Sequence, residues 1–203
     1  MGYDYHSEIN EDNQLGSGGE LVTAYADLMK RIWLKPAKST EDRRVLVTKG
    51  FKKRVASYAP NFKGDYQHDS HEFIATLLDG LHEDLNRIKG AKPYIEEEDN
   101  DGSEDQEGVA VEAWERYLQR DKSAIVDMFQ GQTRSETSCR DCGHKNIRFE
   151  AFMYLSLPIT DECKSLDDAL DLFVAEEEMT GENQWYCGKC EKHVDATKKA
   201  DLW

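Results

Sequence analysis

Four of the five cysteines in this 203-residue chain have the spacing of metal ligands. Cys139 and Cys142 form one C-x-x-C pair, and Cys187 and Cys190 form a second pair further along the chain. Two intervening residues let both sulfurs of a pair turn towards one metal ion at about 2.3 Å, so two pairs can complete a tetrahedral zinc site. The alternatives are two disulfides, or core thiols without a common role. The spacing favours structural zinc that joins two hairpins distant in the chain.

The residues beside these pairs support tight turns. Gly143 follows the first pair and Gly188 lies within the second, and we expect both to supply the open backbone that such turns need. His144 and His193 also lie next to the pairs. Either imidazole could replace a thiolate, although four cysteines already saturate a tetrahedral site.

The remaining residues offer few candidates for a catalytic group. Cys163 stands at a predicted helix start, where a thiol pKa can fall, but no glycine-rich turn or partner motif surrounds it. We interpret it as an incidental, half-buried thiol. His68 and His71 could act as base or ligand, although surface or hydrogen-bonding roles are commoner. The sequence has no phosphate loop, dinucleotide fingerprint or H-E-x-x-H motif. The residues alone therefore predict an α+β domain that structural zinc holds together, without a demonstrable active site.

The composition limits which classes of binding partner and which cellular compartment we expect. The net charge of -15 opposes binding to nucleic acid and to anionic membranes, so we expect neutral or basic partners. No apolar run approaches the roughly 20 residues of a membrane span, and the N-terminus has no signal-peptide core. Cysteines in metal spacing indicate a reducing compartment, which predicts a cytoplasmic or nuclear location.

Helical periodicity dominates the first part of the chain. It predicts helices over residues 20–33, 48–57, 69–89, 111–120 and, after a loop, up to 174, with a short apolar run at 124–129. The longest begins with Asp69 and Glu72 in the positions of a capping box. Its apolar stripe includes Leu81, and its polar face is expected to carry Glu83 and Asp84.

The rest of the chain predicts a loop and strands. Residues 96–108 are acidic and lack aromatic side chains, so we expect a disordered surface loop. Strands are predicted over 133–138, 147–157 and 194–202, the second from its strict apolar alternation. The fold class is therefore α+β. We divide it into a helical part, residues 1–130, and a β part, residues 131–203.

The chain contains, in order, the motifs GDYQHDSHEF at 64–73, LLDGLHEDLN at 77–86, IVDMFQG at 125–131, LSLP at 155–158, WYC at 185–187 and ATKKADLW at 196–203. Together these motifs resemble those of ubiquitin-specific proteases. The two C-x-x-C pairs fit the same family. The resemblance covers almost the whole chain, and His68, where the family often has Gln, is a minor departure.

The resemblance implies a partial papain-like fold, with thumb helices, zinc-bearing β fingers and part of the palm. It implies a cysteine protease that grips ubiquitin and hydrolyses the isopeptide bond after its C-terminal glycine, with ubiquitin and ubiquitinated proteins as partners and Zn²⁺ as a structural cofactor. Asp69, His71 and Glu72 match the family positions that bind the ubiquitin tail. Carboxylates there would pair with the tail's arginines.

The family's cysteine box would precede Met1, and its histidine box would follow Trp203. We therefore expect this chain alone to lack the nucleophile and the general base, and to be inactive. One alternative is a noncatalytic ubiquitin-binding zinc module. Another is a zinc-ribbon interaction domain for nucleic acid, which the charge of -15 opposes.

Overall fold

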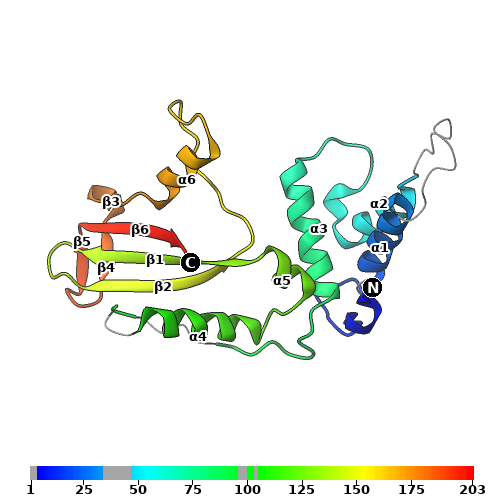
Figure 1. The fold of residues 1–203 in the computed structure, drawn as a ribbon, viewed down its shortest axis with the longest axis horizontal. Helices are drawn as coiled ribbons and strands as arrows, with labels where there is room; N and C mark the ends of the chain where they lie inside the picture. Colours follow the sequence, from blue (N-terminus) through cyan, green and yellow to red (C-terminus); the bar gives the residue numbers. More distant parts are fainter. Residues whose placement is uncertain (1–3, 34–46, 96–99, 103–104) are drawn as a thin grey trace. The chain divides into compact units, whose positions relative to one another are not determined.

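The computed structural model describes residues 4–33, 47–95, 100–102 and 105–203, and it combines helices and strands, which confirms the α+β prediction (Figure 1). Contacts divide the chain into two compact units. The first contains Met1–Lys92 and Asp121–Met128, and the second contains Pro93–Arg120 and Phe129–Trp203. The sequence-based division after residue 130 differs from this, because the helix within 93–120 packs against the sheet.

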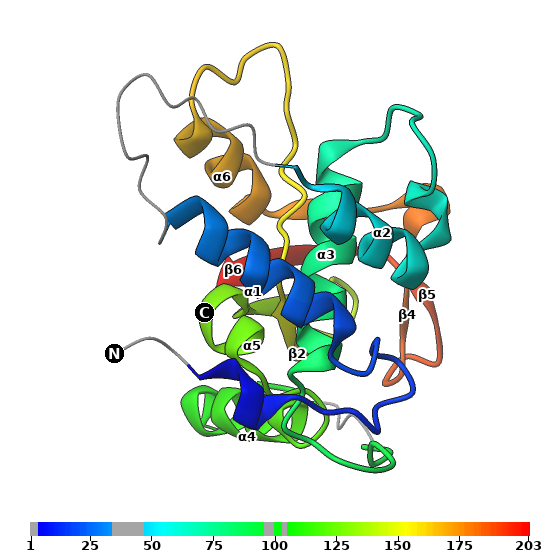
Figure 2. The same cartoon turned by 90° about the vertical axis from the view of Figure 1, so that its right-hand side faces the viewer.

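The first unit is built from helices (Figure 2). Its elements are η1 (Tyr5–Glu8), α1 (Glu20–Trp33), α2 (Lys49–Tyr58), η2 (Pro60–Phe62), α3 (Ser70–Asp84) and α5 (Ala124–Phe129). Helix α1 packs against both α2 and α3. Leu21, Val55 and Leu81 are buried, as their helical spacing predicts.

Helix α3 ends at Asp84, five residues earlier than the predicted end at residue 89. The next backbone groups bond elsewhere: the carbonyls of Asn86 and Ile88 accept from Asn10 Nδ2 at 2.8 and 3.0 Å. The Arg87 amide donates to the Lys122 carbonyl at 2.7 Å. Because these long-range bonds replace the i→i−4 ladder, the chain leaves the helix although its apolar periodicity continues.

Gly80 lets α3 approach its two neighbours closely. A Cβ at this position would lie 2.5 Å from Leu21 Cδ2 of α1 and 2.7 Å from Tyr58 Cε1 of α2. Such distances are shorter than any van der Waals contact, so a side chain here would force the helices apart.

Gly80→Ala is therefore expected to destabilise the first unit by about 1–3 kcal/mol, since overpacking outweighs the gain of up to about 1 kcal/mol in helix propensity. The matched control is Gly50→Ala in α2, where a Cβ meets nothing within 4 Å. The control should be neutral or slightly stabilising. Chemical denaturation followed by circular dichroism measures both, and a Gly80→Ala protein as stable as the parent would contradict the packing argument.

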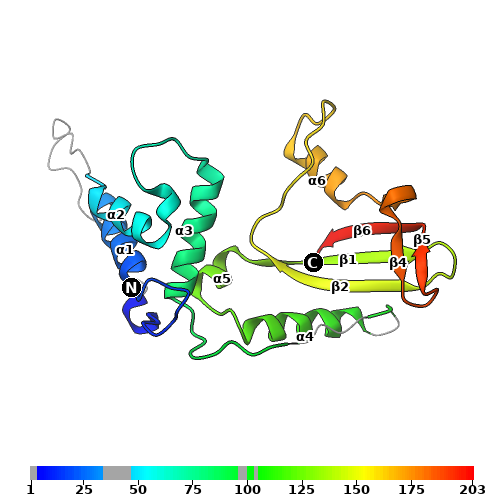
Figure 3. The ribbon, with the colours of Figure 1, turned by 180° about the vertical axis from the view of Figure 1, so that it is seen from behind.

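The second unit contains the sheets. Its elements are α4 (Gln106–Leu118), β1 (Gly131–Cys139), β2 (Lys145–Phe152), α6 (Leu166–Val174), β3 (Glu177–Met179), η3 (Gly181–Asn183), β4 (Trp185–Cys187), β5 (Lys192–Val194) and β6 (Ala196–Leu202). Four strands pair in the order β2-β1-β6-β3, and β4 pairs with β5 in a separate ribbon. Figure 3 shows this ribbon beside the turn that joins β1 to β2. A capping box stands at the start of α6, with Ser165 and Asp168 bonded reciprocally.

Strand β2 keeps the predicted alternation but is shorter than the predicted 147–157. Ile147 is buried and Phe149 is half-buried, whereas Arg148 and Glu150 are exposed. The strand ends at Phe152 because its partner ends there: the first residue of β1, Gly131, pairs with Phe152.

The predicted acidic loop at 96–108 is corrected in part. Asn100 is buried, and its carbonyl accepts the Ile147 amide at 2.7 Å in an isolated bridge to β2. Asp105 caps α4, which begins at Gln106 rather than at residue 111. Backbone bonding to β2 and a capped helix start therefore replace disorder at these positions. Residues 96–99 and 103–104 lie outside the described residues.

Candidate functional site

The first cysteine pair closes the hairpin between β1 and β2. Cys139 is the last residue of β1, and its amide donates to the His144 carbonyl at 2.8 Å. The Cys142 amide points at Cys139 Sγ, 3.4 Å away. Gly143 has φ of 68°, the left-handed conformation that glycine adopts without strain, which agrees with the role expected for it.

The second pair closes the β4–β5 ribbon. Cys187 ends β4, and its carbonyl accepts the Glu191 amide at 2.8 Å. The residue with positive φ in this turn is Glu191, at 53°, and not Gly188. The expectation for Gly188 was therefore wrong in detail, because the left-handed turn falls after Cys190 rather than inside the pair.

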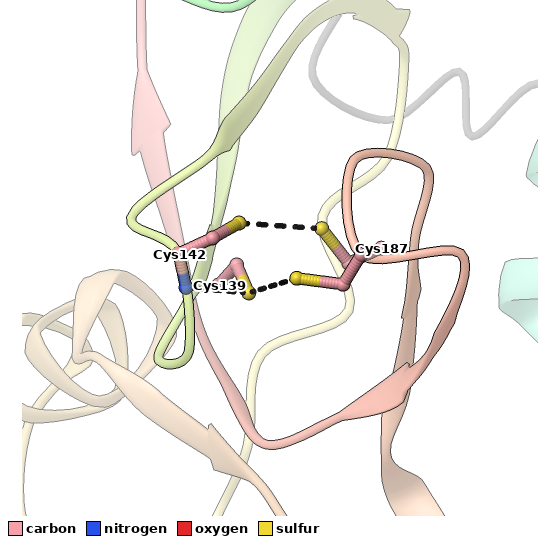
Figure 4. Close-up of side chains that lie close together, drawn as sticks. Cys139, Cys142 and Cys187 are labelled. Carbon is pink, nitrogen blue, oxygen red and sulfur yellow. Dashed lines mark hydrogen bonds between the residues drawn. The ribbon is translucent and has the colours of Figure 1, made fainter.

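These two turns bring the four sulfurs together (Figure 4). Cys139 Sγ lies 3.9 Å from Cys190 Sγ, and Cys142 Sγ lies 3.7 Å from Cys187 Sγ. All four lie within 4.8 Å of one another. Ligands at 2.3 Å from a tetrahedral zinc ion are about 3.8 Å apart, whereas a disulfide requires about 2.05 Å. The geometry fits a four-thiolate metal site and does not fit disulfides.

Electrostatics within the cluster also favour a cation. Burial raises the pKa of Cys139, but hydrogen bonds led by the Cys142 amide lower it to about 7. Hydrogen bonding to Cys142, followed by burial, raises the pKa of Cys190 to about 12. Four thiolates at this spacing repel one another, so a divalent ion is needed to hold them all ionised.

The neighbouring histidines do not join the cluster. His144 stacks on Trp185 with ring centroids 6.3 Å apart, and His193 Nδ1 lies 3.4 Å from the Gln184 carbonyl. The close ligand set consists of the four cysteines, which leaves no position for an imidazole.

The described hydrogen bonds of Cys163 include none to a histidine. Its sulfur contacts the Thr160 amide and hydroxyl at 3.5 Å and the Pro158 carbonyl at 3.9 Å. A nucleophilic thiol needs a base within hydrogen-bonding reach. These contacts support its interpretation as an incidental thiol.

The start of α3 carries the three residues matched to ubiquitin binding. Asp69 Oδ1 accepts the amides of His71 and Glu72 at 2.7 and 3.1 Å. These bonds, that of Glu72 first, lower the pKa of Asp69. The capping box is only half formed, because Glu72 Oε1 accepts from Asn61 Nδ2 at 3.0 Å instead. All three side chains are exposed on the first unit.

A buried polar network on the first unit was missed by the sequence analysis, which placed Glu83 and Asp84 on a solvent-facing side of the helix. Both are buried, together with His82. Their burial could have been suspected only from the density of Asn and His residues around them, which is a weak signal. Lys92 Nζ lies between Asp121 Oδ1, at 2.6 Å, and Glu83 Oε1, at 3.1 Å. The lysine ammonium supplies the cation that this group of carboxylates needs.

The network fixes the orientation of His82. Ser123 Oγ accepts the amides of Ile125 and Val126 at 3.2 Å each. Since a hydroxyl has two lone pairs, its proton is left to donate to His82 Nδ1 at 2.8 Å. His82 Nε2–H then donates to Asp121 at 3.2 Å. A fully buried serine in such contacts joins α3 to α5 and is not a nucleophile.

The free energy of unfolding of the first unit is expected to depend on pH through the carboxyl group of Asp121. Burial raises the pKa of this carboxyl, but hydrogen bonds from His82 and Lys92 outweigh it and lower the pKa to about 2. A depressed pKa contributes stability above the unfolded value of about 3.9, which is lost as pH falls towards 2. Asp121→Asn is expected to flatten the fall in unfolding free energy between about pH 4 and 2. An unchanged slope in denaturation at a series of pH values would contradict this.

Comparison with known proteins agrees with the sequence motifs. A family model described as ubiquitin carboxyl-terminal hydrolase matches residues 2–194, and the chain therefore belongs to this family of ubiquitin-specific proteases. The chain is 47% identical over 156 residues to ubiquitin carboxyl-terminal hydrolase 10 of Arabidopsis thaliana, covering 77% of this chain and 16% of the relative. It is 45% identical over 152 residues to ubiquitin carboxyl-terminal hydrolase 32 of Homo sapiens, covering 75% and 9%.

The family resemblance is thus confirmed, and the described elements belong to part of that protease fold. The chain spans less than a fifth of the length of these relatives. None of the described helices combines the length and the hydropathy needed to cross a membrane.

Proposed function

We propose that this chain is the ubiquitin-gripping part of a cysteine deubiquitinase, whose full-length form hydrolyses the isopeptide bond after the C-terminal glycine of ubiquitin. The observation that carries the proposal is the family match over residues 2–194. The four-sulfur cluster, at the spacing of a structural zinc site, supports it independently.

The start of α3 is the proposed contact for the ubiquitin tail. Asp69 uses one carboxylate oxygen as the helix cap, and no described hydrogen bond engages Oδ2. Its lowered pKa favours the ionised form at neutral pH. An exposed, ionised carboxylate with a free oxygen suits a guanidinium, and Glu72 supplies a second carboxylate one helical turn away. His71 completes the proposed binding set.

Structural zinc is the proposed cofactor, with Cys139, Cys142, Cys187 and Cys190 as its ligands. Zinc held by four thiolates has no open position for substrate, so its role would be to hold the fingers together. The proposed partners are ubiquitin and ubiquitinated proteins. The charge of -15 speaks against nucleic acid and anionic membranes, and a cytoplasmic or nuclear location follows from the use of reduced cysteines.

We further propose that this chain does not perform the chemistry by itself. Its thiols are either in the sulfur cluster or, in Cys163, without a histidine among the described contacts. A ubiquitin propargyl probe should leave the purified chain unlabelled. Labelling at Cys163 would overturn this part of the proposal.

The substitution Asp69→Asn tests the proposed binding of ubiquitin at the start of α3. Asparagine caps a helix about as well as aspartate, so α3 should keep its start while the charge is lost. Ubiquitin titrated into the labelled chain should shift amide signals in α3, and the variant should weaken the binding about fivefold or more. Asp105→Asn makes the same change at the cap of α4, and should have no effect. Equal binding by the parent and Asp69→Asn would reject the assignment.

The second candidate is a noncatalytic ubiquitin-binding zinc module. The same capped, acidic helix start favours it. Both candidates predict ubiquitin binding, and they differ in the longer protein: extension to the family's cysteine and histidine boxes should create probe labelling only if the protein is a deubiquitinase.

A further inference from the structure

The four sulfurs of the cluster differ in their access to solvent. Cys139 and Cys187 are buried, with 3% and 0% of their surfaces exposed, whereas Cys142 is exposed and Cys190 is partly buried. Gly143, the residue after Cys142, has open space beside it, since a Cβ there would meet nothing within 4 Å. With zinc bound, all four sulfurs would be thiolates, so exposure decides which of them an oxidant attacks first. That sulfur is Cys142 Sγ.

Cys142 contacts a sulfur of the other hairpin. It lies in the turn between β1 and β2, and its Sγ is 3.7 Å from Sγ of Cys187, the last residue of β4 (Figure 4). A disulfide needs about 2.05 Å between its sulfurs, so these two must approach each other by less than about 2 Å. Cys139 and Cys190 form a second contact between the hairpins, at 3.9 Å. Each of these contacts joins one hairpin to the other.

Hydrogen peroxide is the oxidant that suits this arrangement. The Cys142 thiolate attacks one peroxide oxygen, so that an S–O bond forms, the O–O bond breaks and hydroxide leaves. The Cys187 thiolate then attacks Cys142 Sγ, so that an S–S bond forms and the S–O bond breaks with loss of a second hydroxide. The two thiolates together lose two electrons, and the peroxide gains them. Because only thiolates bind the metal well, a zinc ion left with Cys139 and Cys190 is released.

We propose that the sulfur cluster is a reversible redox switch, in which peroxide converts a zinc-bound form into a zinc-free form held by a disulfide between Cys142 and Cys187. The disulfide replaces the metal as the link between the two hairpins. It closes a loop of 45 residues, and a cross-link over such a loop restrains the unfolded chain. A disulfide within one pair, such as Cys139–Cys142, would leave the hairpins unlinked. A dithiol reductant restores the thiolates and allows zinc to bind again.

This switch rests on the proposed zinc site, and the first measurements separate the two. Elemental analysis of the untreated chain tests the metal site, and a chain without zinc rejects both the site and the switch. The zinc-loaded chain is then treated with hydrogen peroxide while a coloured metal indicator follows the release of zinc. A chain that contains zinc and keeps it under peroxide rejects the switch alone.

The position of the cross-link is the second measurement. After treatment with peroxide, free thiols are alkylated, and the disulfide-linked peptides of a digest are identified by mass spectrometry. We expect a cross-link between the peptides of Cys142 and Cys187. The amide signals of β4 and β5 should stay dispersed, whereas a chelator, which removes zinc without adding a cross-link, should make them collapse. Disulfides found only within the C-x-x-C pairs, or collapse of these signals under peroxide, would overturn the proposal.

Cys142→His tests which sulfur is attacked first. Zinc accepts three cysteines and one histidine as ligands, so this variant should bind the metal while it lacks the exposed sulfur. Peroxide should release its zinc about tenfold more slowly than that of the parent, because the remaining ligand sulfurs are less exposed. Cys190→His, the matched control, has the same ligand types but keeps Cys142 and Cys187, and should release zinc at about the parent rate.

The zinc content of both variants is measured before peroxide is added. Release from Cys142→His as fast as from the parent would contradict attack at Cys142. Should either variant fail to hold zinc, the identity of the cross-link in the parent decides the proposal.

Discussion

Replacing Cys142 and Cys190 together by serine is expected to abolish zinc binding and to unfold the β4–β5 ribbon. The parent chain should contain one zinc ion per molecule by elemental analysis, and the double variant none. The four sulfurs join turns that are 45 to 51 residues apart in the chain, and the apolar residues around them are few. With so small a core, the metal supplies much of the local folding free energy, on the order of 10 kcal/mol for comparable sites.

The zinc prediction has a matched control in Cys163→Ser, which removes a thiol outside the cluster. That variant should keep its zinc and its stability. Addition of a strong chelator to the parent should reproduce the loss seen in the double variant, with amide signals of β4 and β5 collapsing first. A double variant that retains one zinc ion, or a parent that contains none, would contradict the assignment of the four ligands.

Asp84→Ala is expected to be the most damaging single change in the first unit. Asp84 is the last residue of α3, and its fully buried side chain lies against the start of α1. Its carboxylate accepts the Ser17 amide at 2.6 Å, the Ser17 hydroxyl at 2.7 Å and the Val22 amide at 3.1 Å. Alanine would leave the buried Val22 amide and the partly buried Ser17 amide unpaired at about 1–3 kcal/mol each, and the stabilising charge at the start of α1 would be lost, so we expect a destabilisation of about 3 kcal/mol or more.

Hydrogen exchange measures this loss where it should occur. The amides of Leu21 and Val22 should lose protection in Asp84→Ala, while those of the β1–β6 pairing in the second unit keep theirs. Asp79→Ala is the control on the same helix, because the Asp79 side chain is exposed and accepts one hydrogen bond, from the Tyr58 hydroxyl at 2.9 Å. Similar losses in the two variants would refute the special role of the buried carboxylate.

Local signals in the sequence predicted most of the elements. Helix α1 has the expected bounds because its apolar spacing is regular, and α6 begins at Leu166, directly after the Ser165 cap, because a capping box is a purely local interaction. The alternation of strand β2 is equally local. Family motifs also identified the class of protein, which the comparisons confirm.

The limits of several elements depended on distant segments. Helix α3 stops at Asp84 because Asn10 and Lys122 take the backbone groups that follow it. The Ile147 amide donates a hydrogen bond to the Asn100 carbonyl and so fixes its position. Strand β2 ends at Phe152 because its pairing partner, Gly131, is the first residue of β1. No local pattern contains such partners, so periodicity extended α3 too far and composition made 96–108 a loop.

The same distinction holds for the sites. The sequence alone determined which four cysteines could bind a metal, because the C-x-x-C spacing sets the geometry within each pair. Only the tertiary structure decided that the two pairs meet, since β1 and β4 approach through the folding of the whole second unit. Tertiary packing also placed Asp84 in the interior, because burial arises from neighbours that are remote in the chain.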